Sequence, residues 1–396
     1  MPEYGRGSRA ALGGAGRCRP PVRHQEWGEG STSVRRQGGT TPRYGDRSAD
    51  AGGEGGTGVR VGLWGLAHPH LPDRVRGWRA AGWEVAGAWD ADPAVRADFC
   101  RQLGVAPAEK ADLLSAATGL VVVDAWPAEA CALAAELIAQ GKPVLLEKPG
   151  APHLAAFAAV RAAAKAAEDH GGTPWLQMGY HFRYSPAVRR LRARLRSHAL
   201  GRVSLVRLHG GAPAGSLPAA DWLRPGERGG LLFGLGCHLV DLALWLWGPP
   251  RLVSCHLLQR ARGPVARHGS EDGAAALWTY PDMLLTLDMS GWERQGYGAG
   301  WSIEAYGEYG EVLATLQPAA LHATQRAPAP QRPCTIRQGW ACAAVDLFTA
   351  EGRDVRERLR RGAPPPCGLA AGAAVLRLLD HLYRAAETGA TVRCSA

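Results

Sequence analysis

The sequence predicts an α/β protein with a Rossmann-type, doubly wound parallel sheet on its N-terminal side, followed by an α+β domain with a mainly antiparallel sheet. Two patterns lead to this expectation. From residue 59 onward, short apolar runs alternate with helix-like stretches, which is typical of βαβ units. Beyond residue 251, apolar runs follow one another with little helix between them, as in antiparallel sheets. A chain of 396 residues is long enough for two domains with separate cores.

Strands in the first part of the chain are expected to be buried on both faces, because their apolar runs are continuous rather than alternating. The expected strands are residues 59–64, 84–89, 120–125, 144–147 and 175–178. A first helix is expected to end near residue 81, and the following ones to cover residues 92–103, 128–140 and 153–169.

The second part of the chain predicts longer helices and a run of strands. The expected strands are residues 202–209, 252–259, 274–279, 284–288 and 302–306. The expected helices are residues 186–196, 231–247, 343–360 and 368–386, the second of them buried and ended by Gly248-Pro249-Pro250. Residues 317–338 are rich in Pro, Ala and Gln and are expected to form a loop.

Residues 1–57 differ from the rest of the chain. They are rich in Gly and Arg, and Leu12, Val22 and Val34 are their only branched aliphatic side chains. Such a segment cannot bury enough apolar surface to offset the entropy of ordering it. We expect a disordered Gly/Arg-rich extension or one that arises from a wrongly chosen start. Its acidic residues and its lack of an amphipathic period disfavour a transit peptide.

Charge and cysteine content exclude several classes of protein. The net charge of +10 is spread thinly and contains no long basic run, so neither nucleic acid nor a membrane surface is expected as a partner. The most apolar stretch, 231–247, is short for a bilayer and contains His238 and Asp241. Nine cysteines without a Cys-x-x-Cys pair predict neither a disulfide framework nor a thiolate zinc site, and indicate a cytoplasmic protein.

A glycine turn follows the first expected strand and opens the first helix. In this place of a doubly wound sheet a dinucleotide pyrophosphate can rest on the N–H groups of the helix terminus. Gly65 fits the first glycine of Gly-x-Gly-x-x-Gly, whereas Ala67 and His70 take the second and third places. A strand–helix turn without a nucleotide is an equally open interpretation. The cofactor-binding residues expected in this turn are Gly62, Gly65, Ala67 and His68.

Asp90 lies 25 residues beyond Gly65, at the end of the second expected strand. A carboxylate there can accept hydrogen bonds from the ribose hydroxyls of an adenosine and repels a 2′-phosphate. We therefore expect NAD rather than NADP. The alternative is that Asp90 only begins a turn with Asp92 and Pro93.

Glu147-Lys148-Pro149 directly follows an apolar strand. A lysine at the carboxyl end of a parallel strand points into the crevice where this fold binds ligands. Its ammonium group can stabilise the alkoxide that forms as a hydride leaves a substrate carbon. Only four of the 46 basic residues are lysines, so Lys148 is more informative than a lysine usually is. A solvated residue at the end of a strand is the alternative.

Together these features resemble the Gfo/Idh/MocA family of NAD(P)-dependent oxidoreductases. The resemblance extends to residues 179–186, to the segment from Gly229-Gly230 through His238 and Asp241, and to the chain end, and so covers about residues 58–395. It implies a dinucleotide-binding domain at 58–177 and a substrate and oligomerisation domain at 178–396. It also implies hydride transfer at a hydroxyl or carbonyl of a sugar, polyol or related small molecule, in a homo-oligomer formed through the C-terminal sheet.

The resemblance assigns roles to particular residues. Lys148 and His238 are the expected catalytic residues, with neutral His238 as the proton acceptor or donor. Trp126, Glu147 and Lys148 join the turn and Asp90 in binding the cofactor. The expected substrate contacts are Tyr180, Arg183, Trp222 and His238.

The chain departs from the family pattern at several places. The family commonly has an Asp four residues before the histidine, where this chain has Gly234, and a Thr-Pro where it has Trp126-Pro127. Nothing in the sequence then orients the His238 imidazole. Two alternatives to the dehydrogenase stay open: an NAD-using glycosidase of the same family, and a non-catalytic member that binds nucleotide or sugar.

His68 and His70 raise the question of a metal site. Two histidines separated by one residue at a helix start do not share a face of that helix, and no nearby Cys/Glu cluster completes a coordination set. No metal is expected.

Overall fold

The structure is a computed structural model. It describes residues 59–66, 68–115, 117–213, 229–260, 270–294, 297–325, 334–339 and 344–394. These residues all belong to one compact unit, Gly56–Ala396. The expected extension at 1–57, Ala67 of the glycine turn and Trp222 lie outside the described residues.

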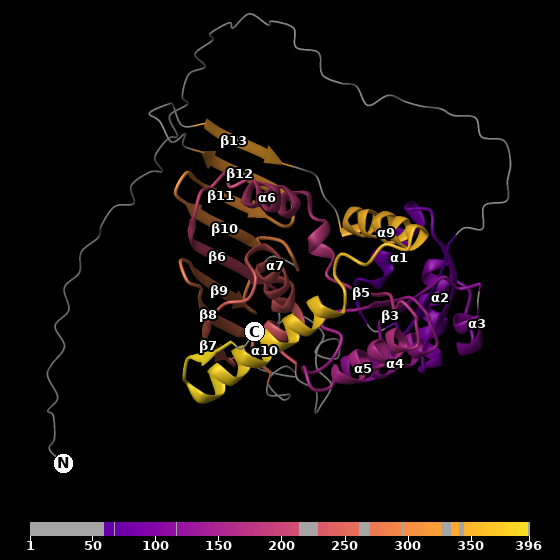
Figure 1. The fold of residues 1–396 in the computed structure, drawn as a ribbon. Coiled ribbons are helices and arrows are strands. Elements are labelled where there is room, and N and C mark those ends of the chain that lie inside the picture. The colour runs from indigo at the N-terminus through magenta and orange to yellow at the C-terminus, as the bar shows by residue number, and fades with distance from the viewer. Residues whose placement is uncertain are drawn as a thin grey trace, which may run out of the picture. The chain divides into compact units, whose positions relative to one another are not determined.

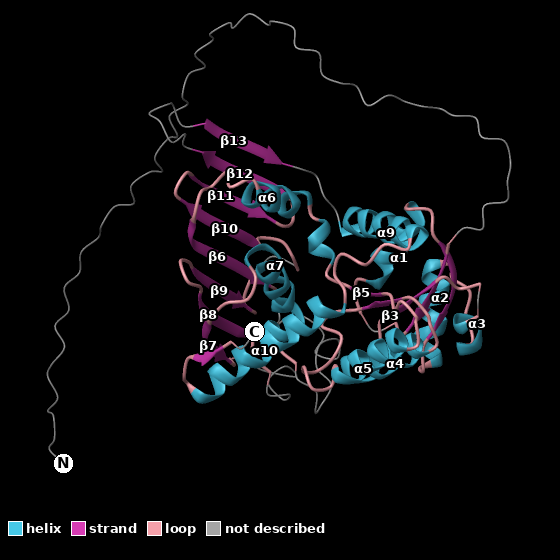
Figure 2. Ribbon diagram, in the orientation of Figure 1, coloured by secondary structure: helices cyan, strands magenta, loops and turns pink. Residues whose placement is uncertain are grey.

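The first sheet is parallel throughout, with strand order β2-β1-β3-β4-β5, as the sequence predicts (Figures 1 and 2). Its strands are β1 (Arg60–Trp64), β2 (Glu84–Trp89), β3 (Leu120–Val123), β4 (Val144–Leu146) and β5 (Leu176–Met178). Every residue of β3 is buried, because alternate side chains enter two separate cores. Val121 and Val123 belong to one core, and Leu120 and Val122 to the other. The continuous apolar run of β3 therefore reflects helices on both faces.

Five helices accompany this sheet. They are α1 (Leu71–Ala80), α2 (Pro93–Leu103), α3 (Lys110–Leu114), α4 (Pro127–Ala139) and α5 (Ala158–Asp169). The start of α2 is fixed by Asp92, whose side chain accepts hydrogen bonds from the backbone N–H groups of Ala94 and Val95. Its end is fixed by Gly104, which has φ +58°. The short α3 was not expected from the sequence.

The second sheet has nine strands in the order β13-β12-β11-β10-β6-β9-β8-β7-β14, and only the β6–β9 pair is parallel. The first five strands are β6 (Val203–Gly211), β7 (Leu252–Leu258), β8 (Gly273–Thr279), β9 (Leu284–Ser290) and β10 (Ser302–Gly307). The remaining four are β11 (Gly310–Thr315), β12 (Ala320–Gln325), β13 (Cys334–Gly339) and β14 (Val392–Arg393).

The loop expected at 317–338 is wrong, because β12 and most of β13 lie within it. In β12, Leu321 and Ala323 are buried, whereas His322 between them is exposed. This period-2 alternation is that of a half-buried strand. The alternating segment is short and contains small residues. The Pro and Gln residues around it therefore favoured the prediction of a loop.

Helices of the second part cover one face of this sheet (Figures 1 and 2). They are α6 (Pro186–Arg196), α7 (Cys237–Trp247) and α10 (Leu369–Thr388). The 3₁₀ helix η1 (His181–Tyr184) precedes α6, the π-helical turn η4 (Leu232–Gly236) precedes α7, and α9 (Ala344–Arg361) packs on α1 instead. The single buried helix expected at 231–247 thus begins with a π turn.

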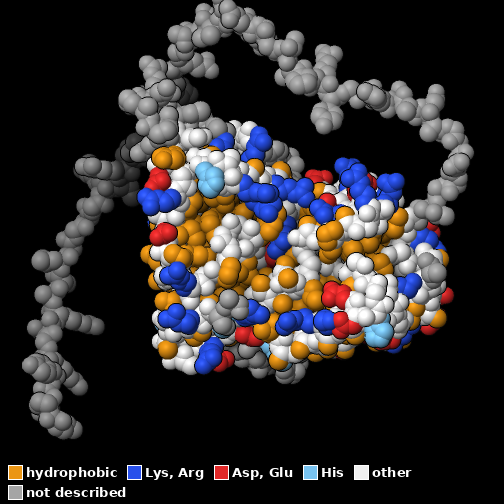
Figure 3. Space-filling view, in the orientation of Figure 1, with side chains coloured by type: hydrophobic (Ala, Val, Ile, Leu, Met, Phe, Trp, Pro, Cys, Tyr) orange, Lys and Arg blue, Asp and Glu red, His pale blue; other side chains and the backbone are white. Residues whose placement is uncertain are grey.

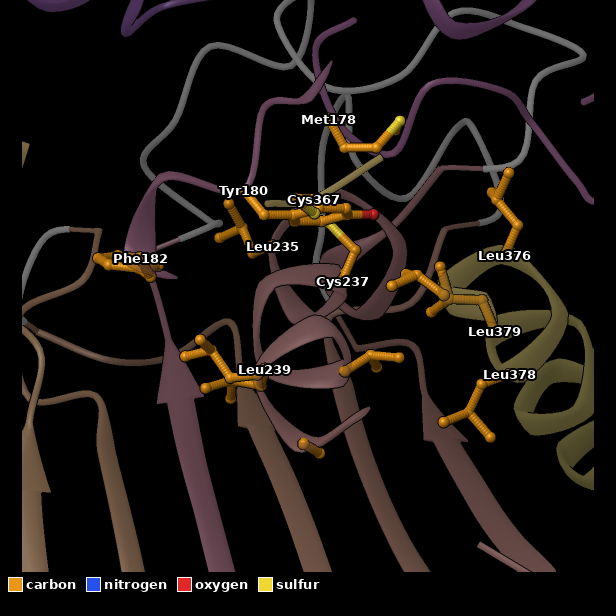
Figure 4. Close-up of a cluster of buried hydrophobic side chains, with 14 of the residues drawn as sticks. Met178, Tyr180, Phe182, Leu235, Cys237, Leu239, Cys367, Leu376, Leu378 and Leu379 are labelled. Atoms are coloured by element: carbon orange, nitrogen blue, oxygen red, sulfur yellow. The ribbon is translucent and has the colours of Figure 1, made fainter. Parts of the chain in front are cut away.

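A large apolar core lies between β5, α7 and α10 (Figure 4). The labelled members of this core are Met178, Tyr180, Phe182, Leu235, Cys237, Leu239, Cys367, Leu376, Leu378 and Leu379. The core joins the end of the first sheet to the helices of the second part.

Helix α9 packs on α1 of the first sheet through buried polar contacts. The Arg74 Nε donates to Glu351 Oε2 over 3.0 Å, and Trp78 Nε1 donates to the same oxygen. Trp83 Nε1 donates to the Gly352 carbonyl over 2.8 Å. A Cβ at Gly352 would lie 3.1 Å from the Trp78 ring, so the helices approach closely there. A distant part of the chain therefore completes the first sheet's outer layer.

Replacing Glu351 with Ala should leave the Arg74 guanidinium partly uncompensated in the core. Removing one partner of a buried ion pair costs about 3 kcal/mol or more, so the free energy of unfolding in urea should fall by about that amount. Glu357 on the same helix forms exposed pairs with Arg360 and Arg361, and Glu357→Ala should cost under about 1 kcal/mol. Equal losses in the two variants would contradict this assignment.

Candidate active site

The glycine turn after β1 is shaped for a close backbone approach. Gly65 has φ +81°, and a Cβ built there would lie 2.5 Å from the backbone nitrogen of Ala125. No side chain fits this place, so glycine is required. The turn leads directly into α1, whose N-terminal N–H groups favour an anion.

Asp90 holds this turn from the end of β2. Its Oδ2 accepts from the backbone N–H of Leu66 over 2.9 Å, and its Oδ1 accepts from Asp92 N. Each carboxylate oxygen keeps a further lone pair for a ribose hydroxyl. The tight turn, the helix terminus and this carboxylate fit the parts of a dinucleotide that the fold binds.

Lys148 lies at the carboxyl end of β4 and is buried. Its Nζ donates to the backbone carbonyl of Gly234 over 2.9 Å. Gly234 lies in the π turn η4, and π turns interrupt the regular hydrogen-bond pattern of a helix. A carbonyl in this turn thus serves as an acceptor for Lys148 at the position where the family commonly has an Asp.

Glu147, next to Lys148, points toward α1. Its Oε2 accepts from Arg74 Nη1 over 2.6 Å, and its Oε1 lies 3.2 Å from His70 Nε2. Burial by itself would raise the pKa of Glu147, but Arg74 and His70 outweigh it and hold that pKa well below its usual range. Glu147 is therefore an ionised anchor between β4 and α1.

Four imidazoles run from the glycine turn to α7, of which His181 and His238 are buried and His68 and His70 are half-buried. Ring centroids are 3.8 Å apart for His68 and His70, 5.0 Å for His70 and His181, and 4.8 Å for His181 and His238. Burial lowers the pKa of each of the four, that of His70 to about 4. For His238, Lys148 and His181 add to the effect of burial. All four imidazoles are therefore neutral at pH 7.

The His238 ring is held by aromatic neighbours rather than by a carboxylate. The rings of Tyr180 and Phe182 lie edge-on to it, with centroids 5.8 and 5.1 Å away. Tyr297 and Trp301 complete the surroundings at 5.9 and 6.5 Å. The sequence did not show what orients the His238 imidazole. In the structure, aromatic rings surround it.

Several buried polar atoms of this cluster have no hydrogen-bond partner within the described part of the chain. They are Nδ1 and Nε2 of His238, Nδ1 of His181 and the hydroxyl of Tyr180. An unsatisfied buried polar group costs about 1–3 kcal/mol, and such groups are rare in folded proteins. Their occurrence around His238 makes this a candidate ligand site.

Two family models match the chain. Residues 59–173 match the model described as the oxidoreductase family with an NAD-binding Rossmann fold, and residues 188–313 match the GFO/IDH/MocA C-terminal domain. The chain belongs to the Gfo/Idh/MocA family. Residues 59–173 are therefore an NAD-binding Rossmann fold, in agreement with the geometry of Gly65 and Asp90.

Relatives within the Gfo/Idh/MocA family include dehydrogenases. Inositol 2-dehydrogenase 2 of Saccharopolyspora erythraea is 30% identical over 186 residues, which are 47% of this chain and 50% of that protein. The chain spans about half the length of the first curated relatives it matches.

Solved structures of the family share the fold. Levoglucosan dehydrogenase in complex with NADH and levoglucosan has a TM-score of 0.73 at 16% identity, covering 86% of this chain and all of that one. A putative myo-inositol dehydrogenase from Sinorhizobium meliloti has a TM-score of 0.69 at 20% identity, covering 85% of this chain and all of that one.

The structure brings some of the expected site residues together and places others elsewhere. Lys148, Tyr180 and His238 lie in or beside the cluster. Arg183, which was expected to contact the substrate, is engaged elsewhere. Its guanidinium donates to both oxygens of Asp241 at 2.8 and 2.6 Å and to the Pro366 carbonyl. These three hydrogen bonds engage the guanidinium within the fold, so it is not positioned as a substrate contact.

The remaining expected cofactor contacts lie near the turn. Gly62 is a residue of β1, where a Cβ would lie 2.8 Å from the Leu113 side chain. Trp126 precedes α4 as its N-terminal cap residue.

Sequence reasoning missed His181, Tyr297 and Arg74 as members of this region. His181 lies beside Tyr180 in a segment that was singled out, so its imidazole was a readable signal. Tyr297 Oη lies 3.5 Å from His181 Nε2, but Tyr297 comes from the connection between β9 and β10, more than 100 residues further along the chain. No local pattern indicates that pair.

The expectation that no carboxylate joins His68 and His70 is wrong. Ligand atoms of these two histidines and of Glu147 lie within 4.8 Å of one another. The positive charges of Arg74 and Lys148 act on the same histidines and oppose a further cation. We therefore propose no metal ion here.

No helix among the described residues combines the length and the apolar character that crossing a bilayer needs.

Replacing Asp90 with Ala should weaken NAD binding and narrow the preference for NAD over NADP, because the ribose loses its acceptor and a 2′-phosphate loses a repelling charge. Fluorescence titrations with NADH and NADPH measure both affinities. Asp98→Ala, an exposed carboxylate change on α2, is the matched control. Equal affinity of the unmodified chain for the two cofactors would remove the role given to Asp90.

Stability should depend on pH through His70. Because its pKa is about 4 in the folded chain and 6.5 ordinarily, the unfolded chain binds the proton first as the pH falls. The folded state therefore loses stability from pH 6.5 toward pH 4. As the pH falls through that range, the free energy of unfolding should decrease in both proteins. The decrease should be smaller in His70→Gln than in the unmodified chain, by about 1.4 kcal/mol for each pH unit. Urea unfolding at several pH values tests this, and parallel curves would contradict it.

Proposed function

We propose that this chain is an NAD-dependent dehydrogenase or reductase acting on CH–OH groups. It transfers a hydride to or from the hydroxyl- or carbonyl-bearing carbon of a sugar, a polyol or a related small molecule. The names of the relatives, inositol 2-dehydrogenase and levoglucosan dehydrogenase, support this substrate class.

The observation that carries the proposal is the set of buried polar atoms without partners around His238. Imidazole nitrogens and a phenol hydroxyl can each exchange hydrogen bonds with alcohol groups, which both donate and accept. A substrate with several neighbouring hydroxyls satisfies such a set, whereas an apolar or a highly charged molecule does not. The aromatic walls from Phe182 and Trp301 exclude water from the same place.

Each residue of the site then has a defined task. NAD, when bound at the Gly65 turn, supplies the hydride acceptor or donor. Lys148 donates a hydrogen bond to the reacting substrate oxygen and stabilises negative charge that develops there. His238, neutral at pH 7, accepts the hydroxyl proton in oxidation and returns it in reduction. We propose Trp126 and Glu147 as further cofactor contacts and Trp222 as a substrate contact.

Gly234 changes how Lys148 is positioned. A neutral carbonyl takes the place of the carboxylate that commonly assists the family's lysine. The Gly234 carbonyl fixes the direction of the ammonium group through a hydrogen bond, in place of an attraction between opposite charges. We propose that this arrangement permits catalysis despite the missing Asp.

We further propose a cytoplasmic homo-oligomer that associates through the C-terminal sheet. Leu258, Leu277, Leu284 and Leu313 are exposed on the face of this sheet that is turned away from its core. Exposed apolar residues gathered on one face favour a protein–protein contact.

The variants Lys148→Met and His238→Ala test the proposed function. Each should lower the turnover of a polyol or sugar substrate by about 10²–10⁴-fold, because each removes a group that stabilises charge or moves a proton in the transition state. NADH affinity should change little in both. His322→Ala, an exposed histidine change on β12, should leave the rate unaltered.

The same assay separates the alternatives. Net NADH formation on a panel of polyols and sugars supports the dehydrogenase. Hydrolysis of a nitrophenyl glycoside without net NADH would indicate the NAD-using glycosidase instead. NAD binding without either reaction would identify a non-catalytic member. Equal rates in the unmodified chain and in both variants would overturn the catalytic roles.

A further inference from the structure

A second feature of the molecule lies outside the histidine cluster, on α6. Arg189, Arg192 and Arg196 are spaced by three and four residues, so they lie on one face of the helix. They line a cavity of about 380 Å³, which is within the range of small-molecule sites. Figure 3 shows Lys and Arg side chains gathered over α6 and near α9. None of the catalytic or cofactor-binding residues proposed above lines this cavity.

Two of these arginines lie over aromatic rings. The Cζ of Arg192 lies 4.3 Å from the centroid of Trp245, and that of Arg189 lies 4.7 Å from the centroid of Tyr184. A cation–π contact of this kind does not use up the N–H donors of a guanidinium, which stay available for other partners. Arg189 is fixed further by donating from Nε to the Arg183 carbonyl. Contacts within the chain therefore position two of the three guanidinium groups.

The charges in this cavity are not balanced. Arg183 pairs with Asp241, and Arg358 pairs with Asp354, whose Oδ2 also accepts from the Tyr184 hydroxyl. In contrast, the three α6 arginines form no ion pair with any residue that the structure describes. Burial lowers the pKa of Arg192, and the nearby charges of Arg196 and Arg183 lower it further. Like charges at this spacing destabilise a helix unless an anion lies between them.

We propose that this cavity binds a small molecule carrying two or more phosphate groups. The three arginines extend over about 10 Å along α6, which exceeds the size of one phosphate group. Guanidinium groups bind phosphate oxygens through pairs of N–H donors, and pre-ordered ones lose little entropy on binding. The inference does not depend on the proposed function, because it concerns a separate set of residues.

Isothermal titration of the full chain with pyrophosphate and with inorganic phosphate, at constant ionic strength, tests the proposal. Pyrophosphate should bind more tightly than phosphate. Arg192→Ala and Arg196→Ala should each weaken pyrophosphate binding about tenfold or more, since a hydrogen bond to a charged group is lost. The change at Arg196 disturbs no stacking contact, so it keeps the test valid if Arg192→Ala unfolds α6.

Arg190→Ala is the matched control. Arg190 lies on the same helix and carries the same charge, but it donates to Gln338 outside the cavity. Its loss should alter pyrophosphate affinity by less than about twofold. Equal losses in Arg190→Ala and Arg192→Ala would overturn the site in favour of unspecific charge attraction, as would pyrophosphate binding that neither cavity variant changes.

Two further measurements separate this site from other phosphate sources. NADH affinity should be the same in Arg192→Ala as in the unmodified chain, and full competition between NADH and pyrophosphate would place the anion in the dinucleotide site instead. Vesicles of phosphatidylcholine with phosphatidic acid should not sediment with the protein. Sedimentation that is lost in Arg192→Ala would assign the cavity to a lipid headgroup and overturn the small-molecule proposal.

Discussion

The buried guanidinium of Arg74 is the interaction on which much of this structure depends. It lies between Glu147 at the end of β4 and Glu351 on α9, and all three side chains are almost fully buried. Burial by itself would lower the pKa of Arg74, but the two carboxylates outweigh it and raise that pKa above its already high value. One cation thus joins three segments that are far apart in the sequence. Because Glu147 directly precedes Lys148, the ion pair between Arg74 and Glu147 also fixes the backbone position from which the Lys148 side chain extends.

Next to this anchor, the buried ammonium group of Lys148 lies near several neutral imidazoles. The four imidazoles are uncharged at pH 7, so Lys148 supplies the positive charge nearest to His238. An anionic group that forms on a substrate is attracted to this charge, while a cationic substrate is repelled. Burial strengthens both effects, since little water remains to screen them. The same physics accounts for the lowered pKa of His238.

Most of the first sheet and several site residues could be predicted from the sequence, and the reasons are local. Strand β2 and helix α6 have the expected bounds, because Gly82 and Pro186 mark their limits. Gly65, Asp90 and Lys148 were readable because each follows a strand at a fixed place in a doubly wound fold. The strands β12 and β13 were not, since their pairing depends on β11 rather than on their own composition.

Long-range pairs account for the rest of what the sequence did not predict. The contact of Arg74 with Glu351 spans 277 residues, and that of Arg183 with Asp241 joins η1 to α7. Neither pair has a sequence pattern of its own. The Arg183 ion pair shows the consequence, because an arginine in a motif segment was interpreted as a ligand contact when it is part of the scaffold.

The π turn η4 has a consequence for how this site can change over evolutionary time. A π turn holds one more residue than an α-helical turn, so it is equivalent to a single-residue insertion in the helix. Removing one residue from this turn would rotate the preceding backbone by about 100° relative to α7. Gly234 would then lose its alignment with Lys148, whereas His238, further along, would keep its place. The number of residues in η4 therefore determines which backbone carbonyl accepts the hydrogen bond from Lys148. A deletion in this turn can change that acceptor although no side chain is exchanged.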